Sequence, residues 1–248
     1  MPELTLPQWL LAVVAAMGVG FSKSGFAGVG LFHVIVFAYL LGPRESTGAL
    51  LPMLIVGDVC AVLFFRQHAR WLYVRRILPP ALIGIVVGWA MMHRLDDHAF
   101  HTVVGGIVLM LALLQLTRMY RPEWFSEIPH ARWFAYSLGF LAGITTMLAN
   151  AAGPMIALYL LAVSLPKFEF VGTGAWFFLI VNVIKVPFSA SLGLIDGETL
   201  VFDATLAPAI LVGMLVGRWL VHRISQRLFD TLMLLFAGVA ALRLLGAL

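Results

Sequence analysis

Charged residues are scarce in this sequence. Of its 248 residues only 11 % are Asp, Glu, Lys or Arg, whereas 62 % are hydrophobic. A soluble domain is normally about a quarter charged, so the composition excludes a mainly water-facing surface and implies that lipid covers most of the chain. At roughly 20 apolar residues per transmembrane helix, the length leaves room for about eight to ten segments and excludes a separate soluble domain.

Cysteine and catalytic motifs are nearly absent as well. Cys60 is the only cysteine, which excludes an internal disulfide and a multi-cysteine metal site. No nucleophile elbow, P-loop, HExxH motif or zinc-ligand cluster occurs, so the sequence predicts neither an enzyme nor a protein with a cofactor or metal. His93, His98 and His101 lie close together in a predicted external loop and are the one alternative for metal binding.

Basic residues are missing from the first ten positions, unlike in a secretory signal, so we expect the first apolar run to be retained. Elsewhere they exceed acidic residues, giving a net charge of +4. The arginines cluster in predicted loops at 66–76 and 218–227, which favours membrane orientation over nucleic-acid binding and places these loops in the cytoplasm. The 192–203 loop carries three acids and no base, so it and both termini are predicted to lie outside.

Apolar runs predict ten membrane segments. Two of them, 28–41 and 154–163, are short, and each follows a break of small residues at 24–28 or 150–154. Short segments of this kind are typical of half-helices or re-entrant pieces. The other predicted segments are 7–22, 47–65, 77–92, 100–117, 132–149, 171–191, 203–221 and 228–247.

The sequence contains an internal repeat. A shift of 129 places 79–102 on 208–231 without a gap, and nine of the 24 positions are identical. A shift of 124 extends the match upstream and pairs Asp58 with Asn182. With five segments in each half, the second copy is inverted in the membrane, which agrees with the opposite charges of the corresponding loops.

We therefore expect an all-α membrane protein with a first transmembrane repeat (1–120), a cytoplasmic linker (121–131) and a second, inverted repeat (132–248). Inverted repeats with broken helices are typical of secondary transporters, whose halves exchange conformations around a site near the bilayer midplane. A channel and a membrane-embedded enzyme are the alternatives that this pattern leaves open.

The two breaks predict an anion site. A helix that begins inside a membrane points free N–H groups and a partial positive charge into a cavity. Glycines at the first break let the backbone approach a ligand, while Asn150 can cap the second helix and Pro154 suits its first turn. Packing of kinked helices through small residues is the alternative. The predicted binding residues here are Ser24, Gly25, Gly28, Gly30, Asn150, Ala151 and Gly153.

Two lysines are also predicted to bind the substrate, because charge inside a membrane is costly and usually functional. Lys23, at the first break, can supply positive charge to an anion or snorkel to an interface. Lys185 lies deeper in its segment, on the same helix face as Asn182. Lys185 and Asn182 are predicted to contact the substrate together, with a carboxylate partner for Lys185 as the alternative.

Asp58 and His33 are predicted to take part in proton coupling. Asp58 is the only acid within a strongly apolar run, and it can carry a proton or form an ion pair with Lys185. His33 can relay a proton or make a core hydrogen bond.

These features resemble the TauE/SafE sulfite exporter family, the four-toluene sulfonate uptake group. The resemblance rests on a twofold pattern of small-residue break, apolar half-helix and proline turn, which ends at Pro43 in the first half and at Pro166 in the second. It covers nearly the whole chain. The two closing Gly-x-x-x-Gly pairs, each before a basic helix end, also look like family features; they are Gly84 with Gly88 and Gly213 with Gly217.

The resemblance implies a multi-pass protein of the bacterial inner membrane that moves sulfite or a small organosulfonate. We expect alternating access, with membrane lipid as its surroundings and an inside-negative potential favouring outward movement of the anion. Both breaks hold fewer glycines than is usual in the family, which leaves the particular substrate open. A homodimer fits this interpretation; an anion channel, or a carrier of a carboxylate or thiosulfate, are the alternatives.

Overall fold

The computed structural model describes residues 4–26, 29–96 and 132–225, together with positions 99, 106, 110, 117, 121 and 228. Every regular element in these ranges is a helix. Five stretches are long and apolar enough to cross a membrane, so the protein is an all-α, polytopic membrane protein. They are formed by α1 (Leu6–Lys23), α3 (Pro43–Phe65), α4 (Trp71–Arg94), α8 (Lys167–Ser191) and α9 (Gly197–Arg223).

Three further helices and a 3₁₀ turn complete the described ranges. The α6 helix (Arg132–Ala149) matches its predicted bounds, and α2 (Gly30–Leu41) and α7 (Gly153–Ala162) are the two short apolar helices that the breaks predicted. A 3₁₀ turn, η2 (Arg66–His68), follows α3. The predicted segments 100–117 and 228–247 and the linker 121–131 lie almost entirely outside the described residues.

The predicted loops were too long, because apolar runs end before the helices do. The α4 helix begins at Trp71, so Arg75 and Arg76 lie within it and not in the 66–76 loop. The α9 helix begins at Gly197, which makes Asp203 a helical residue, buried with 6 % exposure. Arg75 is exposed, so its charged end can reach water although the residue is helical.

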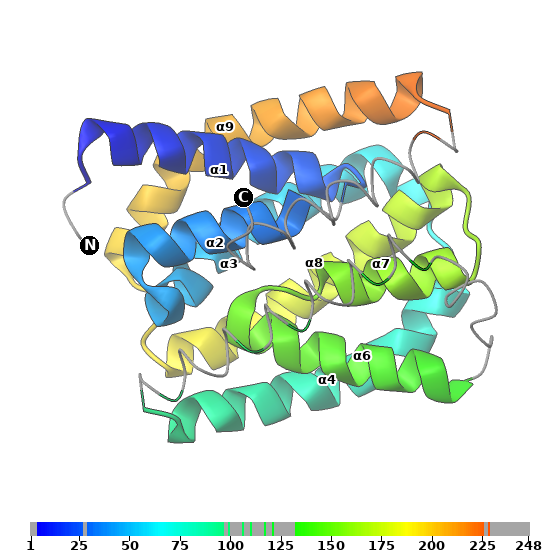
Figure 1. Ribbon diagram of the computed structural model, residues 1–248, viewed down its shortest axis with the longest axis horizontal. Helices are drawn as coiled ribbons and strands as arrows, with labels where there is room; N and C mark the ends of the chain where they lie inside the picture. Colours follow the sequence, from blue (N-terminus) through cyan, green and yellow to red (C-terminus); the bar gives the residue numbers. More distant parts are fainter. Residues whose placement is uncertain are drawn as a thin grey trace.

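Two pairs of parallel helices form the outer layers, α1 with α9 and α4 with α6 (Figure 1). Glycines bring their backbones together: a Cβ on Gly20 would lie 1.9 Å from the carbonyl oxygen of Ile210, and one on Gly143 would lie 2.0 Å from that of Ala81. Gly84 and Gly213 are equally tight, so the predicted role of the Gly-x-x-x-Gly pairs in close packing is confirmed.

The centre is formed by α3 and α8, which run antiparallel between the two outer pairs (Figure 1). Contact runs from Gly48 against Leu194 at one end to Gly172 against Phe65 at the other. Midway, Asp58 meets Asn182, its partner in the predicted repeat. An inverted repeat requires its equivalent central helices to be antiparallel, as these are.

In each half a basic side chain near the start of one long helix binds the carbonyl end of another; we call these contacts the ties. Arg44 of α3 donates hydrogen bonds to the carbonyl oxygens of Met92 and Leu95, at the end of α4. Lys167 of α8 donates to those of Val221 and Ile224, at the end of α9. A shift of 123 relates the two cations and a shift of 129 relates the two pairs of carbonyls, so positions that the repeat makes equivalent form equivalent contacts.

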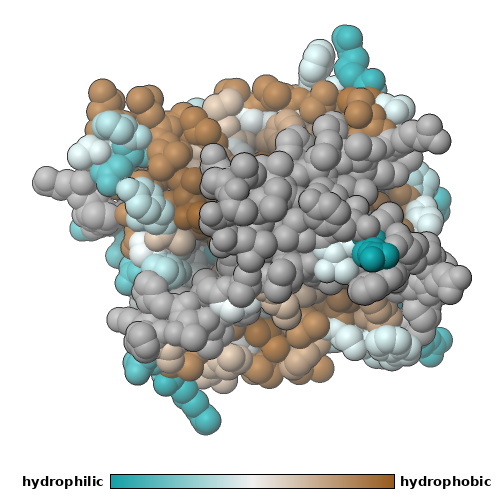
Figure 2. All heavy atoms as spheres, viewed as in Figure 1, coloured by the Kyte–Doolittle hydropathy of each residue, from teal (hydrophilic) through white to brown (hydrophobic). Residues whose placement is uncertain are grey.

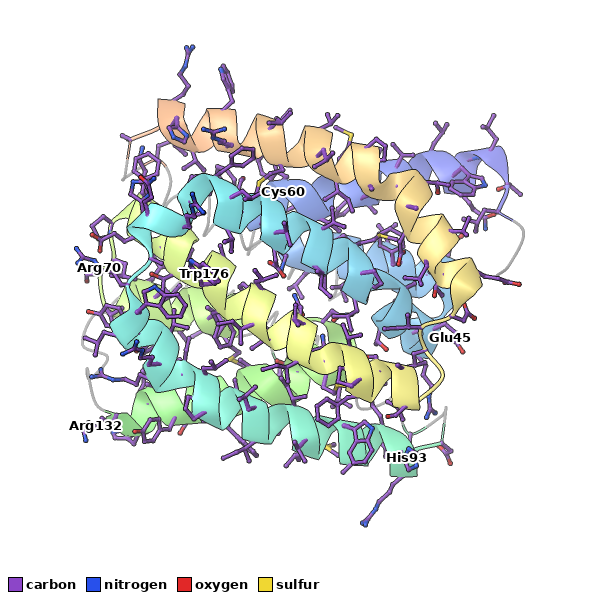
Figure 3. All side chains as sticks on the ribbon, turned by 180° about the vertical axis from the view of Figure 1, so that it is seen from behind. Glu45, Cys60, Arg70, His93, Arg132 and Trp176 are labelled. Carbon is purple, nitrogen blue, oxygen red and sulfur yellow. The ribbon has the colours of Figure 1, made fainter. Side chains whose placement is uncertain are left out.

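The surface is divided into hydrophilic ends and a hydrophobic middle. Hydrophilic residues gather toward the ends of the helices, and the uncovered middle of the face in Figure 2 is mostly hydrophobic. Arg70 and Arg132 lie at one end of the molecule, and Glu45 and His93 lie at the other (Figure 3). Apolar side chains such as Ile83 and Leu215 are exposed between these ends, where a bilayer would cover them.

Candidate functional site

A small cavity lies where the two helix breaks meet the central helices. Its volume is about 60 Å³, and because a water needs only about 10–15 Å³ on such a measure, it has room for a small polyatomic group. Its walls come from α1, α2, α3, α6, α7 and α8. The polar residues among those that line it are Ser22, Lys23, His33, Asp58, Thr146, Asn150 and Asn182.

Both short helices begin at this cavity. The α2 helix starts at Gly30 and α7 starts at Gly153; both glycines line the cavity, and neither helix has a side-chain cap. The first N–H groups of a helix have no partner within it and carry a partial positive charge. The predicted pair of helix starts is therefore present, and each can donate to an anion.

The backbone at each break takes a conformation that its residues permit. Gly25 has a φ of 120°, which a residue with a side chain rarely adopts, and Asn150 has a φ of 52°. The prediction that Asn150 caps α7 is wrong, because Ala152 occupies the N-cap position. Gly25, Asn150 and Ala151 all line the cavity.

Lys23 carries its charge into the site and does not snorkel to an interface. Its side chain is 10 % exposed, and its ammonium lies 2.7 Å from Oδ1 of the fully buried Asp58. The ammonium also lies 4.5 Å from the centre of the Phe178 ring. Gly57 gives room for the lysine stem, since a Cβ there would lie 3.0 Å from Lys23 Cγ.

Asp58 is held from a second side. Asn182 donates a hydrogen bond from Nδ2 to Asp58 Oδ2 at 2.6 Å. The predicted ion pair of Asp58 with Lys185 is wrong: the carboxylate pairs with Lys23. The buried Oδ1 of Asn182 has no hydrogen-bond partner among the described residues, and Asn182 lines the cavity.

Lys185 lies beside the cavity and fixes its wall. Only 1 % of the residue is exposed. It donates to Oδ1 of Asn150 at 2.5 Å and to the hydroxyl of Thr146 at 3.2 Å. Asn150 in turn donates to the carbonyl oxygen of Thr47 on α3. Lys185 is thus absent from the described lining, and it acts on the cavity through the asparagine.

Other predicted residues fall in different places. His33 lines the cavity, and its buried Nδ1 has no hydrogen-bond partner in the described part of the chain, so the alternative of a core hydrogen bond does not hold for that atom. Ser24 is absent from the lining: its hydroxyl donates to the carbonyl of Phe21, beside Gly217 of α9. Gly28 lies outside the described residues.

Sequence reasoning missed several lining residues, among them Ser22, Thr146 and Phe178. Phe178 lies one helical turn before Asn182, so the spacing on α8 was an available signal. Thr146 occupies the position equivalent to Lys23 in the second half, at a shift of 123. For Ser22, adjacency to Lys23 was the only signal, and it is a weak one.

The fold and the site define a class of protein. This is a polytopic membrane protein with a cavity lined in part by polar residues, at which two short helices begin and a lysine is paired with an aspartate. Among the described residues no group of three or more His, Cys, Asp or Glu is placed to hold a metal; His98 and His101 lie outside the described part.

The family follows from comparison with known proteins. The model of the sulfite exporter TauE/SafE family matches residues 11–244, nearly the whole chain, and the chain belongs to that family. The resemblance inferred from the sequence is thereby confirmed. No curated protein and no solved structure matches the chain.

Proposed function

We propose that this protein is a carrier that exports sulfite or a small organosulfonate from the bacterial cytoplasm by alternating access. Membership of a sulfite exporter family supports an anion substrate and a membrane location. The antiparallel α3 and α8 and the matched contacts of Arg44 and Lys167 support two inverted halves that can rock about the cavity between them.

One observation carries the choice of an anion: the ammonium of Lys23 and the starts of α2 and α7 share one cavity. Sulfite and sulfonate groups present three oxygens, and each can accept from a different donor. We propose that Lys23 binds one oxygen and that N–H groups near Gly30 and Gly153 bind the others. Binding through backbone groups suits a small inorganic anion.

The direction of transport follows from charge. An inside-negative potential favours outward movement of an anion by about 2.3 kcal/mol per charge per 100 mV. We propose that the arginine-rich end with Arg70 and Arg132 faces the cytoplasm. Cysteines placed one at a time at the two ends, in a Cys60→Ser background, would report this orientation through an impermeant thiol reagent.

Transport can be tested with the purified protein in liposomes. We expect saturable efflux of labelled sulfite. An inside-negative membrane potential should accelerate this efflux, and organosulfonates should inhibit it. Thr205→Val, a change of a partly buried hydroxyl on α9 that does not line the cavity, is the control for handling of the membrane. Absence of saturable flux for every sulfur anion, with the protein folded, would contradict the proposal; ion currents far above carrier turnover would identify a channel.

A further inference from the structure

The cavity that we propose for the transported anion already contains a negatively charged group, the carboxylate of Asp58. Asp58 is fully buried, lines the cavity and contacts the ammonium of Lys23 at 2.7 Å. Lys23 is the one lysine or arginine among the described residues of the lining. An incoming anion and the Asp58 carboxylate therefore require the same cation.

A second contact holds Asp58 in the site when the transported anion binds Lys23. Asn182 binds the other carboxylate oxygen at 2.6 Å and comes from α8, whereas Lys23 comes from α1. The two partners thus approach Asp58 from different helices and different halves of the chain. Loss of the lysine contact leaves the asparagine contact in place.

Neighbouring charges favour such an exchange. Lys185, on α8, interacts electrostatically with both Asp58 and Lys23, and His33, on α2, interacts with Lys23. From α9, the residue that packs against the neighbouring Gly57 is the apolar Ile210. Lys185 thus places positive charge beside the Asp58 carboxylate without lining the cavity, so it favours keeping that carboxylate in the site when an incoming anion binds Lys23.

From this geometry we propose that Asp58 is a resident counter-anion: it occupies Lys23 when the carrier is empty, and the transported anion displaces it. This inference rests on the proposed function and gives Asp58 a role other than carrying a proton. The empty carrier can change conformation because Asp58 neutralises the Lys23 charge inside the membrane, where an unpaired charge is costly. The loaded carrier is neutralised by the substrate instead.

The proposal predicts that Asp58→Asn separates binding from return of the empty carrier. With its competitor removed, Lys23 should bind sulfite more tightly, by about tenfold or more for one charge-assisted contact. The empty variant would hold an unpaired lysine charge, so net efflux should fall at least tenfold, by the same arithmetic. Exchange of internal for external sulfite never passes through the empty state, and it should continue.

The experiment measures sulfite affinity, net efflux and sulfite–sulfite exchange for wild type, Asp58→Asn and Asp58→Glu. Asp58→Glu keeps a carboxylate and should restore net efflux, while Asp203→Asn removes a buried acid that is not in the described lining and is the matched control. A single symmetrical elution peak in detergent verifies that each variant is folded.

The outcomes separate this inference from the function on which it rests. Tighter binding with exchange retained and net efflux lost supports the resident counter-anion. Equal loss of exchange and net efflux, or unchanged affinity in Asp58→Asn, overturns it while wild-type transport stands. Unchanged transport with a lost pH dependence would assign Asp58 to proton coupling instead. If wild type neither binds nor moves any sulfur anion, both proposals fall.

Discussion

The two halves of the chain share a frame, by which we mean their helix packing and helix-end contacts, but they place different side chains at the central breaks. In the frame, Arg44 and Lys167 make the same contacts to equivalent carbonyls, and glycines bring α1 to α9 as they bring α4 to α6. At the breaks, the first half presents Lys23 to the cavity, whereas the equivalent Thr146 of the second half accepts a hydrogen bond from Lys185.

This difference shows which features must be repeated and which must not. In the alternating access that we propose, the two halves need matched packing, because each must adopt the conformation that the other leaves. A single anion needs one principal cation, and two facing lysines would leave an unpaired charge inside the membrane. We infer that the frame is constrained to symmetry and that the site is constrained to asymmetry.

The largest effect should come from changing the matched glycines. Gly20→Ala and Gly143→Ala each place a Cβ about 2 Å from a backbone oxygen, at 1.9 and 2.0 Å. Overpacking of this kind costs about 1–3 kcal/mol or more, and backbone cannot move aside as a side chain can. Both variants should lose most folded protein, measured by fluorescence-detected size exclusion. Gly197→Ala meets no atom within 4 Å and is the control; tolerance of only one of the two changes would break the symmetry.

The second prediction concerns the two lysines. Lys23→Met combined with Asp58→Asn, which avoids leaving a buried unpaired carboxylate, should weaken sulfite binding by about tenfold to a hundredfold. Lys185→Met should weaken binding only a few-fold but lower thermal stability by about 1–3 kcal/mol, because it leaves the Asn150 acceptor buried and unpaired. Calorimetric titration and thermal unfolding measure the two effects. Equal losses of affinity would show that both lysines face the anion.

The third prediction compares the two ties at the helix ends. Arg44→Gln and Lys167→Gln each remove charged donors from the carbonyls at the end of a helix. Because both side chains are partly exposed, we expect about 1 kcal/mol from each and a Tm lower by about 2–4 °C. The two decreases should be alike. A loss confined to one variant would show that only one half relies on its tie.

Much of the frame was predictable because apolar periodicity and small-residue breaks report directly on a membrane environment. The bounds of α6 were correct, and α2 and α7 were correct within two residues. Predicted helix starts were wrong where helices extend into polar sequence. A proline in the first turn lets α3 begin at Pro43, and α9 begins at Gly197, six residues before Asp203. A search for apolar runs does not detect either feature.

The site was only partly predictable, because partners across helices are set by rotation of each helix. Sequence symmetry brought Asp58 to Asn182, and those residues are hydrogen bonded. It gave no sign that Asp58 would pair with Lys23, because Lys185 lies deeper in its segment and is related by the repeat to the neighbourhood of Asp58, whereas Lys23 lies at a break. Ser24 was expected in the cavity, but one residue along a helix turns a side chain by about 100°, which directs it to α9.

The smallest effect is expected at the starts of the two equivalent helices α4 and α9. Asp196 caps α9, accepting from the backbone N–H of Thr199 at 2.8 Å, whereas Arg70 at the start of α4 makes no side-chain cap. That backbone hydrogen bond lowers the pKa of Asp196 below its ordinary value of 3.8. The folded state therefore favours the ionised form, so the cap contributes fully above pH 3.8 and is lost as the pH falls through the lowered pKa.

Asp196→Ala should accordingly lower the Tm slightly at neutral pH and leave it unchanged in acid, where the wild-type cap is protonated. Asp196→Asn is the matched control, since asparagine caps a helix as well as aspartate does but does not titrate. Its stability relative to Asp196→Ala should stay constant across the acid range. If both variants follow one pH profile, the titrating group lies elsewhere, and the difference between the starts of α4 and α9 rests on the turn geometry and not on the charge of the cap.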